Sequence, residues 1–360
     1  MRSRRPLQAG LALLVLLLTA GCFGETLEQL SIIYGIAYEL DPDNKELLTA
    51  TASIPQYVKG GFENRLVTAQ GKSSMDIRNA MSLQTSGRLV DEKMLVLLID
   101  HQLARQSTYR LLGPYMSELK LPARSLIAVT ETSPKELLGI NMQKMDPATG
   151  MNAIVAKHER LGLMPKSNLL TFVKQQVREG QDPYLPLIAK EEDGQGIRIV
   201  GLALFKDDRY VMPLKGAGNL LLFALLHQSV TNGTYELGGG KQSLRMRIER
   251  SGVSYDWRPS EKKMDVRVRV HASLLERTTS PTEVFSEAVT IELKRKAERE
   301  LADRLGMLIR KLQRSGLDPV GFGEIARSQD SHWKGSEWNS IYQQTKFNIV
   351  VKINFDRERR

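Results

Sequence analysis

Alternation of apolar and polar residues marks several strands in the second half of the chain. Leu244 to Ile248 and Val266 to Val270 are apolar at every second position, with arginines between. Because successive side chains of a strand point to opposite faces, this pattern predicts antiparallel strands with one face on a core and the other in water. A final strand is predicted from Phe347 to Phe355.

A helical period replaces the strand period between Thr282 and Ser315. Its apolar residues form one stripe, which consists of Ala297, Leu301, Leu305, Leu308, Ile309 and Leu312. Such a stripe is typical of a helix that packs one side on a core. Gly316 follows and is suited to end the helix in a left-handed conformation. The second half is therefore predicted to be α+β, with one long helix packed against an antiparallel sheet.

The first half is predicted to be mixed α/β. Runs from Leu27 to Tyr38 and from Leu47 to Ile54 flank turn-forming residues, which predicts a hairpin. Residues 55–64 are expected to form a loop. A helix is predicted from Ser74 to Leu83, with Ser73 or Ser74 as its N-cap.

Helices and strands are expected to alternate beyond that helix. The apolar run within Lys93 to Asp100 has the length of a buried central strand. A further strand at 126–129 and a helix beginning at Ser133 continue the pattern. Residues 183–196 are polar and rich in charge, proline and glycine, and we interpret them as a linker.

These patterns predict a multidomain chain with mixed sheets, α/β followed by α+β. Residues 1–21 are a leader, 22–195 an N-terminal mixed α/β region that could hold two subdomains, and 196–360 a C-terminal α+β domain. The C-terminal domain is expected to begin with strands from Ile197 to Phe205 and from Tyr210 to Leu214.

Cys22 is the only cysteine among 360 residues, and it lies directly behind the leader. Three arginines, an apolar stretch from Leu11 to Leu18, and the small residues Ala20 and Gly21 precede it, in the order of a cleavable signal. The apolar stretch is shorter than the roughly 20 residues that cross a bilayer. Because Cys22 has no disulfide partner, we predict that it carries diacylglyceryl and N-acyl lipid and anchors the protein on the outer face of the cytoplasmic membrane. The alternative is a secretory signal with an incidental cysteine.

Composition is that of an ordinary globular protein, with 41% hydrophobic and 26% charged residues. The formal net charge is +10, which could favour an anionic membrane surface or wall polymer. The default interpretation is a mildly basic, solvated surface. Nucleic acid is not expected as a partner, because the chain is exported and its basic residues form no patch with interleaved aromatics.

Two glycine motifs resemble nucleotide-binding signatures, and neither fits. Gly71-Lys72-Ser73 ends like a phosphate-binding loop, but Leu66 occupies the position of that loop's first glycine. Gly321 to Ala326 has dinucleotide-fingerprint spacing but follows a long helix, so we expect a tight loop that lets Phe322 enter the core. The histidines lack metal-site spacing, and no Gly-x-Ser-x-Gly elbow occurs. We therefore expect a binding or scaffolding protein without metal or cofactor, and not an enzyme.

Several segments in a fixed order carry a resemblance to a known family. They are the Cys22 motif, Gly35-Ile36-Ala37, Gly71-Lys72-Ser73, the strand from Lys93 to Ile99, Gly201 to Asp208, and Asp318 to Glu324 with Trp333 and Trp338 behind it. In this order the chain resembles the Ger(x)C family of spore germination lipoproteins, the C subunits of spore germinant receptors. The similarity runs nearly end to end.

This resemblance implies a multidomain α/β fold without known catalytic residues. It implies a place on the outer face of the inner spore membrane, beside an integral-membrane A subunit and a B subunit related to amino-acid transporters. The complex would sense a small nutrient, and the family does not indicate that the C subunit itself binds it.

If the protein docks to partners, three aromatic residues near the glycine motif are candidates for the interface: Phe322, Trp333 and Trp338. The alternative is that they close the core of the C-terminal domain. Two other functions remain open: a substrate-binding lipoprotein of a transport system, which would need two similar lobes around a cleft, and a wall-remodelling enzyme, which would need an acidic groove.

Overall fold

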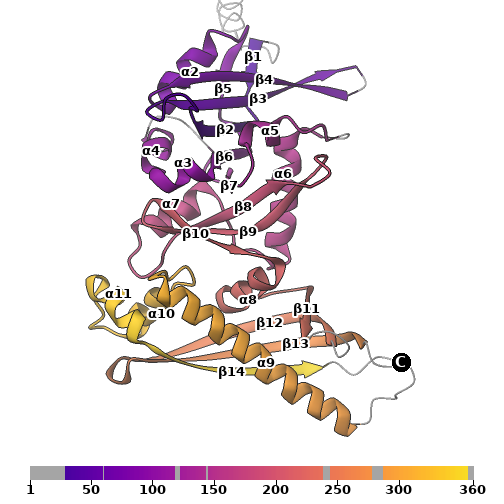
Figure 1. Cartoon of the computed structure of the whole chain (residues 1–360), viewed down its shortest axis with the longest axis vertical. Helices are drawn as coiled ribbons and strands as arrows, with labels where there is room; N and C mark the ends of the chain where they lie inside the picture. Colours follow the sequence, from indigo (N-terminus) through magenta and orange to yellow (C-terminus); the bar gives the residue numbers. More distant parts are fainter. Residues whose placement is uncertain are drawn as a thin grey trace, which may run out of the picture.

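The computed structural model describes residues 29–59, 61–117, 122–142, 145–237, 244–277 and 287–355. The leader and Cys22 lie outside the described residues, as do the first residues of the predicted strand at 27–38 and of the predicted helix at 282–315. Figure 1 shows an elongated molecule in which two sheets follow one another along the long axis.

The larger sheet has eight strands in the order β10-β9-β8-β7-β6-β2-β3-β4. They are β2 (Gly35–Leu40), β3 (Leu48–Val58), β4 (Gly61–Gly71), β6 (Val96–Asp100), β7 (Leu126–Thr130), β8 (Tyr184–Lys190), β9 (Ile197–Lys206) and β10 (Arg209–Lys215). The four central strands β2, β6, β7 and β8 are parallel, and antiparallel strands flank them on both sides. A two-stranded sheet of β1 (Leu30–Ile32) and β5 (Arg88–Val90) lies beside it.

Helices cover both faces of the larger sheet, which explains why its central strands are apolar throughout. In β6, Val96 and Leu98 belong to one core, and Leu97 and Ile99 belong to the other. One face is covered by α2 (Ser74–Ser82), α3 (His101–Gln106), α4 (Tyr109–Ser117) and α7 (Leu169–Val177). The opposite face is covered by α5 (Pro134–Leu138), α6 (Pro147–Arg160) and α8 (Ala217–His227).

The C-terminal sheet has the order β11-β12-β13-β14. Its elements are β11 (Gly233–Leu237), β12 (Leu244–Arg258), a 3-10 turn (Pro259–Glu261), β13 (Lys263–Arg277), α9 (Glu287–Arg314), α10 (Phe322–Gln329), α11 (Gly335–Gln344) and β14 (Lys346–Phe355). The predicted stripe of α9 is buried, and Gly316 adopts a φ of +65°. The mixed α/β and α+β class and the long helix on the C-terminal sheet are thus confirmed.

The prediction of a wholly antiparallel C-terminal sheet is wrong for one pair, because β14 runs parallel to β13. The long helix α9 follows β13 and brings the chain back toward the end of the sheet at which β13 begins. A helical crossover of this kind joins parallel neighbours.

The predicted linker at 183–196 is also wrong. Residues 184–190 form β8, and the polar residues behind it form a hairpin turn in which the Glu191 N–H donates to the Gly196 carbonyl at 2.8 Å. Strands β9 and β10, expected to open the C-terminal domain, therefore complete the first sheet. The division at 195/196 does not coincide with the division between the sheets, which follows Lys215.

The loop expected at 55–64 is wrong as well, because β3 and β4 extend through it as a paired hairpin. The strand predicted at 27–38 is divided, because its described part forms β1, which pairs with β5, and the start of β2 in the larger sheet. Most of the other elements form as predicted. The hairpin of β2 and β3, the strands β6, β7, β12 and β13, and the helix α5 are all present. Ser73 caps α2, and its Oγ accepts the Asp76 N–H at 3.2 Å.

The two sheets share one core. The larger apolar cluster runs from one face of the first sheet through α8 to the inner face of the C-terminal sheet. All residues of α8 from Leu221 to Leu226 are buried, as expected of a helix that is apolar on every side. Figure 1 shows α8 between the sheets, where it joins both parts of the core.

Candidate functional site at the junction of the two sheets

A buried carboxylate, that of Asp318, lies where the C-terminal part of the chain meets the first sheet. Its Oδ1 accepts the N–H groups of Gly321 and Phe322, each at 3.0 Å. Its Oδ2 accepts the Gly323 N–H at 2.8 Å and Trp338 Nε1 at 3.0 Å. The three backbone donors are the N-cap residue Gly321 and the first two residues of α10. N–H groups at the start of a helix have no partner within the helix, and this end of a helix favours negative charge.

Asp182, in the loop before β8, connects Asp318 to the first sheet. The Asp182 N–H donates to the Asp318 carbonyl at 2.9 Å, and the Asp318 N–H donates to Asp182 Oδ2 at 2.6 Å. Lys206 of β9 donates its Nζ to Asp182 Oδ1 at 2.9 Å. Burial raises the pKa of Asp182, although the bonds from Asp318 and Lys206 oppose this rise. Burial also raises the pKa of Asp318 to about 7, although the hydrogen bonds from Phe322, Gly323 and Trp338 lower it; repulsion from Asp182 adds to the rise.

Two glycines let the backbones of the two parts come into direct contact. The Glu324 N–H of α10 donates to the Gly180 carbonyl at 3.1 Å. A β-carbon on Gly323 would lie 2.5 Å from Gly180 Cα and 2.5 Å from Trp338 Nε1. Gly180 has a φ of +91°, a conformation that other residues rarely adopt. No side chain larger than hydrogen fits at this contact, so glycine is required on both sides.

The three aromatic interface candidates lie near this junction, and two of them are buried there. Phe322 is 0% exposed and packs against the ring of Phe347 at 4.7 Å between centroids. Trp338 is 4% exposed and packs edge-on against Trp257 at 5.7 Å. Trp333 is half-buried beside Trp338. Phe322 and Trp338 therefore have the surroundings of core residues, and Trp333 alone of the three reaches the surface.

Sequence reasoning found the glycine–aromatic segment but missed the acid that organises it. Gly321 has a φ of +86°, which fits the tight loop predicted there. Asp318 precedes Gly321 by three residues, the spacing at which a side chain can accept the first free N–H groups of a helix. That spacing is a signal in the sequence. Asp182 and Gly180 carry no comparable signal, because they meet Asp318 and Gly323 only in the folded chain.

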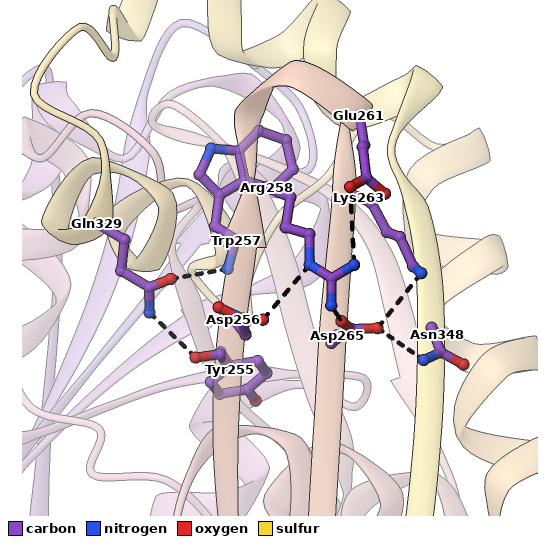
Figure 2. Close-up of polar contacts among 9 residues, drawn as sticks. All are labelled: Tyr255, Asp256, Trp257, Arg258, Glu261, Lys263, Asp265, Gln329 and Asn348. Carbon is purple, nitrogen blue, oxygen red and sulfur yellow. Dashed lines mark hydrogen bonds and ion pairs between the residues drawn. The ribbon is translucent and has the colours of Figure 1, made fainter.

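The other end of α10 is attached to the open edge of β12, beyond the residues that pair with β11 (Figure 2). Gln329 Oε1 accepts the Trp257 N–H at 2.7 Å, and its Nε2 donates to the Tyr255 carbonyl at 3.1 Å. The helix is thus held at its start by the first sheet and at its end by the second.

Figure 2 also shows a polar cluster around Asp265 of β13. Its Oδ2 accepts a hydrogen bond from Arg258 Nη2 at 2.5 Å, and its Oδ1 accepts one from Asn348 Nδ2 at 2.6 Å. Lys263 Nζ lies 3.8 Å from Oδ1. The hydrogen bond from Asn348 lowers the pKa of Asp265, and the charges of Arg258 and Lys263 act in the same direction. The charge of Asp265 is therefore neutralised locally by its own neighbours.

A cavity of about 320 Å³ opens beside the junction, with Asp182, Lys206, Asp318, Trp338 and Tyr342 among its lining residues. Both oxygens of Asp318 are occupied by donors, and Lys206 is paired with Asp182. The arrangement of these two aspartates is suited to holding two parts of the chain in a fixed relation. Within the described residues, no group of three or more His, Cys, Asp or Glu side chains is placed to hold a metal ion.

None of the helices in the described ranges is long and apolar enough to span a bilayer.

Comparison with known proteins gives consistent matches along the chain. Residues 24–190 match the family model described as spore germination protein N-terminal domain, and residues 200–358 match the model described as spore germination B3/GerAC like, C-terminal. Spore germination protein GerQC of Bacillus cereus is 22% identical over 333 residues, which is 91% of each chain. The crystal structure of the GerBC protein superposes with a TM-score of 0.60 at 14% identity, covering 90% of this chain and 97% of that one.

The two family models meet between residues 190 and 200, whereas the sheets divide after Lys215. Most of β9 and all of β10 thus fall within the C-terminal model, although both strands complete the first sheet. Both models occur in order and together span most of the chain, so the protein belongs to the GerAC-like family of spore germination proteins.

Proposed function

We propose that this chain is the lipid-anchored C-type subunit of a nutrient germinant receptor. The observation that carries the proposal is the match of both family models, in order, together with similarity to a spore germination protein over 91% of the chain. The proposed role is docking and not catalysis. The occupied carboxylate of Asp318 supports this, because it ties two parts together instead of standing free.

Cys22 is the proposed site of attachment to the inner spore membrane. The leader of arginines, apolar residues and small residues before it supports processing and acylation of this thiol. Two or more acyl chains hold a protein on a bilayer far more stably than one. Confinement to the membrane raises the effective concentration of the chain toward membrane-embedded partners without any new contact.

The proposed partners are an integral-membrane A subunit and a B subunit related to amino-acid transporters, with the nutrient sensed by the complex. The rigid connection between the sheets supports docking, since a preorganised body loses less conformational freedom on binding. The shared core and the Asp318–Asp182 contacts provide that connection.

Replacement of Cys22 tests the proposal in spores that lack the native gene. Spores carrying Cys22→Ala are expected to lose nutrient-triggered germination and the membrane-bound form of the chain, while vegetative growth is unchanged. Phe23→Ala is the matched control, because it alters the neighbouring residue and keeps the thiol. Normal germination with Cys22→Ala, or an unmodified thiol in the mass of the processed wild-type N-terminus, would contradict the anchor.

A further inference from the structure

The C-terminal sheet has one covered face and one open face. On the covered face, valines and isoleucines of β13 and β14, such as Val268 and Ile353, pack into the shared core beneath α8 and α9. On the open face, Arg267 and Arg269 of β13 are exposed, as is Arg250 of β12. The alternation of the sequence thus separates apolar residues from arginines across the sheet.

Strand pairing gathers these arginines, which the sequence alone did not predict. Three successive rows across β12, β13 and β14 contain basic residues and no acid: Arg250–His271–Asn354, Gly252–Arg269–Lys352 and Ser254–Arg267–Val350. The neighbours of Arg269 and Arg267 on β12 are small, so these two guanidinium groups are not enclosed from that side. The rows form a basic face, which we call the arginine face.

The arginines of this face are not used inside the described part of the chain. The side chains of Arg250, Arg267 and Arg269 form no hydrogen bond or ion pair among the residues that the structure describes. Arg267 contributes only at longer range, by lowering the pKa of Asp265. An exposed guanidinium without a partner retains its donors for an external anion.

Acids border the arginine face but are themselves paired. The next row is Asp256–Asp265–Asn348, in which Asp265 is bound by Arg258 and Asn348, and Asp256 lies 3.6 Å from Arg258 (Figure 2). On the other side, Glu249 accepts the Ser273 hydroxyl at 2.9 Å and keeps its negative charge. Within the rows, Lys352 Nζ lies 4.0 Å from Glu298 Oε2. The positive charge of the face therefore rests on Arg250, Arg267 and Arg269, whose side chains form no ion pair among the described residues.

We propose that the arginine face binds the anionic phospholipid headgroups of a bilayer. Guanidinium groups bind phosphate through paired hydrogen bonds, and a face that presents three arginines on neighbouring strands can contact several headgroups at once. None of the residues in the three rows is Phe, Tyr or Trp, whereas surfaces for single-stranded nucleic acid combine basic charge with aromatic stacking. The contact does not require lipid on Cys22, and it would act as a second, electrostatic attachment in addition to the acyl chains.

Vesicle flotation tests this contact with the chain from residue 22 onward, made without its leader and carrying Cys22→Ser, so that no acyl chain is present. The variant R250Q/R267Q/R269Q removes three charges from the face. The matched control R124Q/R198Q/R209Q removes three exposed arginines that lie in or beside the first sheet and also form no ion pair in the described residues. Circular dichroism establishes that both variants are folded.

We expect the wild-type chain to float with phosphatidylglycerol vesicles at about 0.05 M salt, to dissociate at about 0.5 M salt, and not to float with phosphatidylcholine. Each arginine near an anionic bilayer contributes about fivefold to binding, so R250Q/R267Q/R269Q should bind on the order of a hundredfold more weakly, and the control should bind as the wild type does.

Equal losses in the two variants would overturn the proposal, since net charge alone would then explain binding. Absence of binding to anionic vesicles, or equal binding to neutral ones, would do the same. Tighter binding of a soluble polyphosphate than of the vesicles, with the same dependence on the three arginines, would assign the face to a polymer and reject the bilayer.

Discussion

Two tryptophans close together in the sequence differ in how their indole N–H groups are used. Trp338 Nε1 donates to Asp318 at 3.0 Å, whereas Trp333 Nε1 is buried without a partner among the described residues. Trp338→Phe should lower the free energy of unfolding by roughly 1–3 kcal/mol, because the carboxylate loses a donor. Trp333→Phe is the matched control and should cost much less. Urea denaturation measures both variants, and equal losses would argue against this role of Trp338.

Asp318 also predicts a dependence of stability on pH. Its pKa is about 7 in the folded chain, against an ordinary value of 3.8. Between these values the folded chain holds a proton that the unfolded chain has released, so the free energy of unfolding falls as pH rises through this window and levels off above it. Asp318→Asn removes the titration. The stability difference between wild type and variant, from thermal unfolding at each pH, should shrink with rising pH; a constant difference would contradict the raised pKa.

At the scale of elements, the approach of α10 to the loop before β8 depends on glycine. Gly323→Ala would place a β-carbon 2.5 Å from Gly180 Cα, and we expect a loss of at least roughly 1–3 kcal/mol from overpacking. Gly218→Ala is the matched control in α8, because a β-carbon there meets nothing within 4 Å; it should gain roughly 0.5–1 kcal/mol of helix stability. Chemical denaturation compares the two. If Gly323→Ala left the free energy of unfolding unchanged, α10 and the loop before β8 would be able to move apart readily.

Periodicity predicted most of the elements, because it reflects which side of each element is buried. It predicted α9 from its apolar stripe and β12 and β13 from strict alternation. It could not predict the direction of β14 or the membership of β9 in the first sheet, because strand partners are chosen in three dimensions. The polar segment behind β8 has the composition of a linker and of a hairpin turn alike.

The site was predictable only in part, for a related reason. The segment from Asp318 to Trp338 is conspicuous for its glycines and aromatic residues, and the structure places it at the junction. Its main partner, Asp182, lies 136 residues away in the chain, and nothing local distinguishes that aspartate. The arginines of β13 were predicted to face water, but their alignment with Arg250 and Lys352 depends on strand register.

At the scale of the whole molecule, the shared core predicts cooperative unfolding. All three tryptophans, Trp257, Trp333 and Trp338, lie in the C-terminal part, so their fluorescence reports on that part and on its junction with the first sheet. Far-UV circular dichroism reports on both sheets. Because one apolar cluster joins the sheets through α8, we expect the two signals to change together in one thermal transition. An earlier fluorescence transition would show that the C-terminal part unfolds independently.

The central claim is that this member of the GerAC-like family works as a membrane-anchored receptor subunit. The most direct measurement is affinity capture of the tagged chain from detergent-solubilised membranes of dormant spores, followed by mass spectrometry of the proteins that co-purify. The account predicts two integral-membrane proteins, one of them related to amino-acid transporters, and their loss from the capture when Cys22 is replaced by alanine. Recovery of the chain alone, or with soluble proteins only, would contradict it.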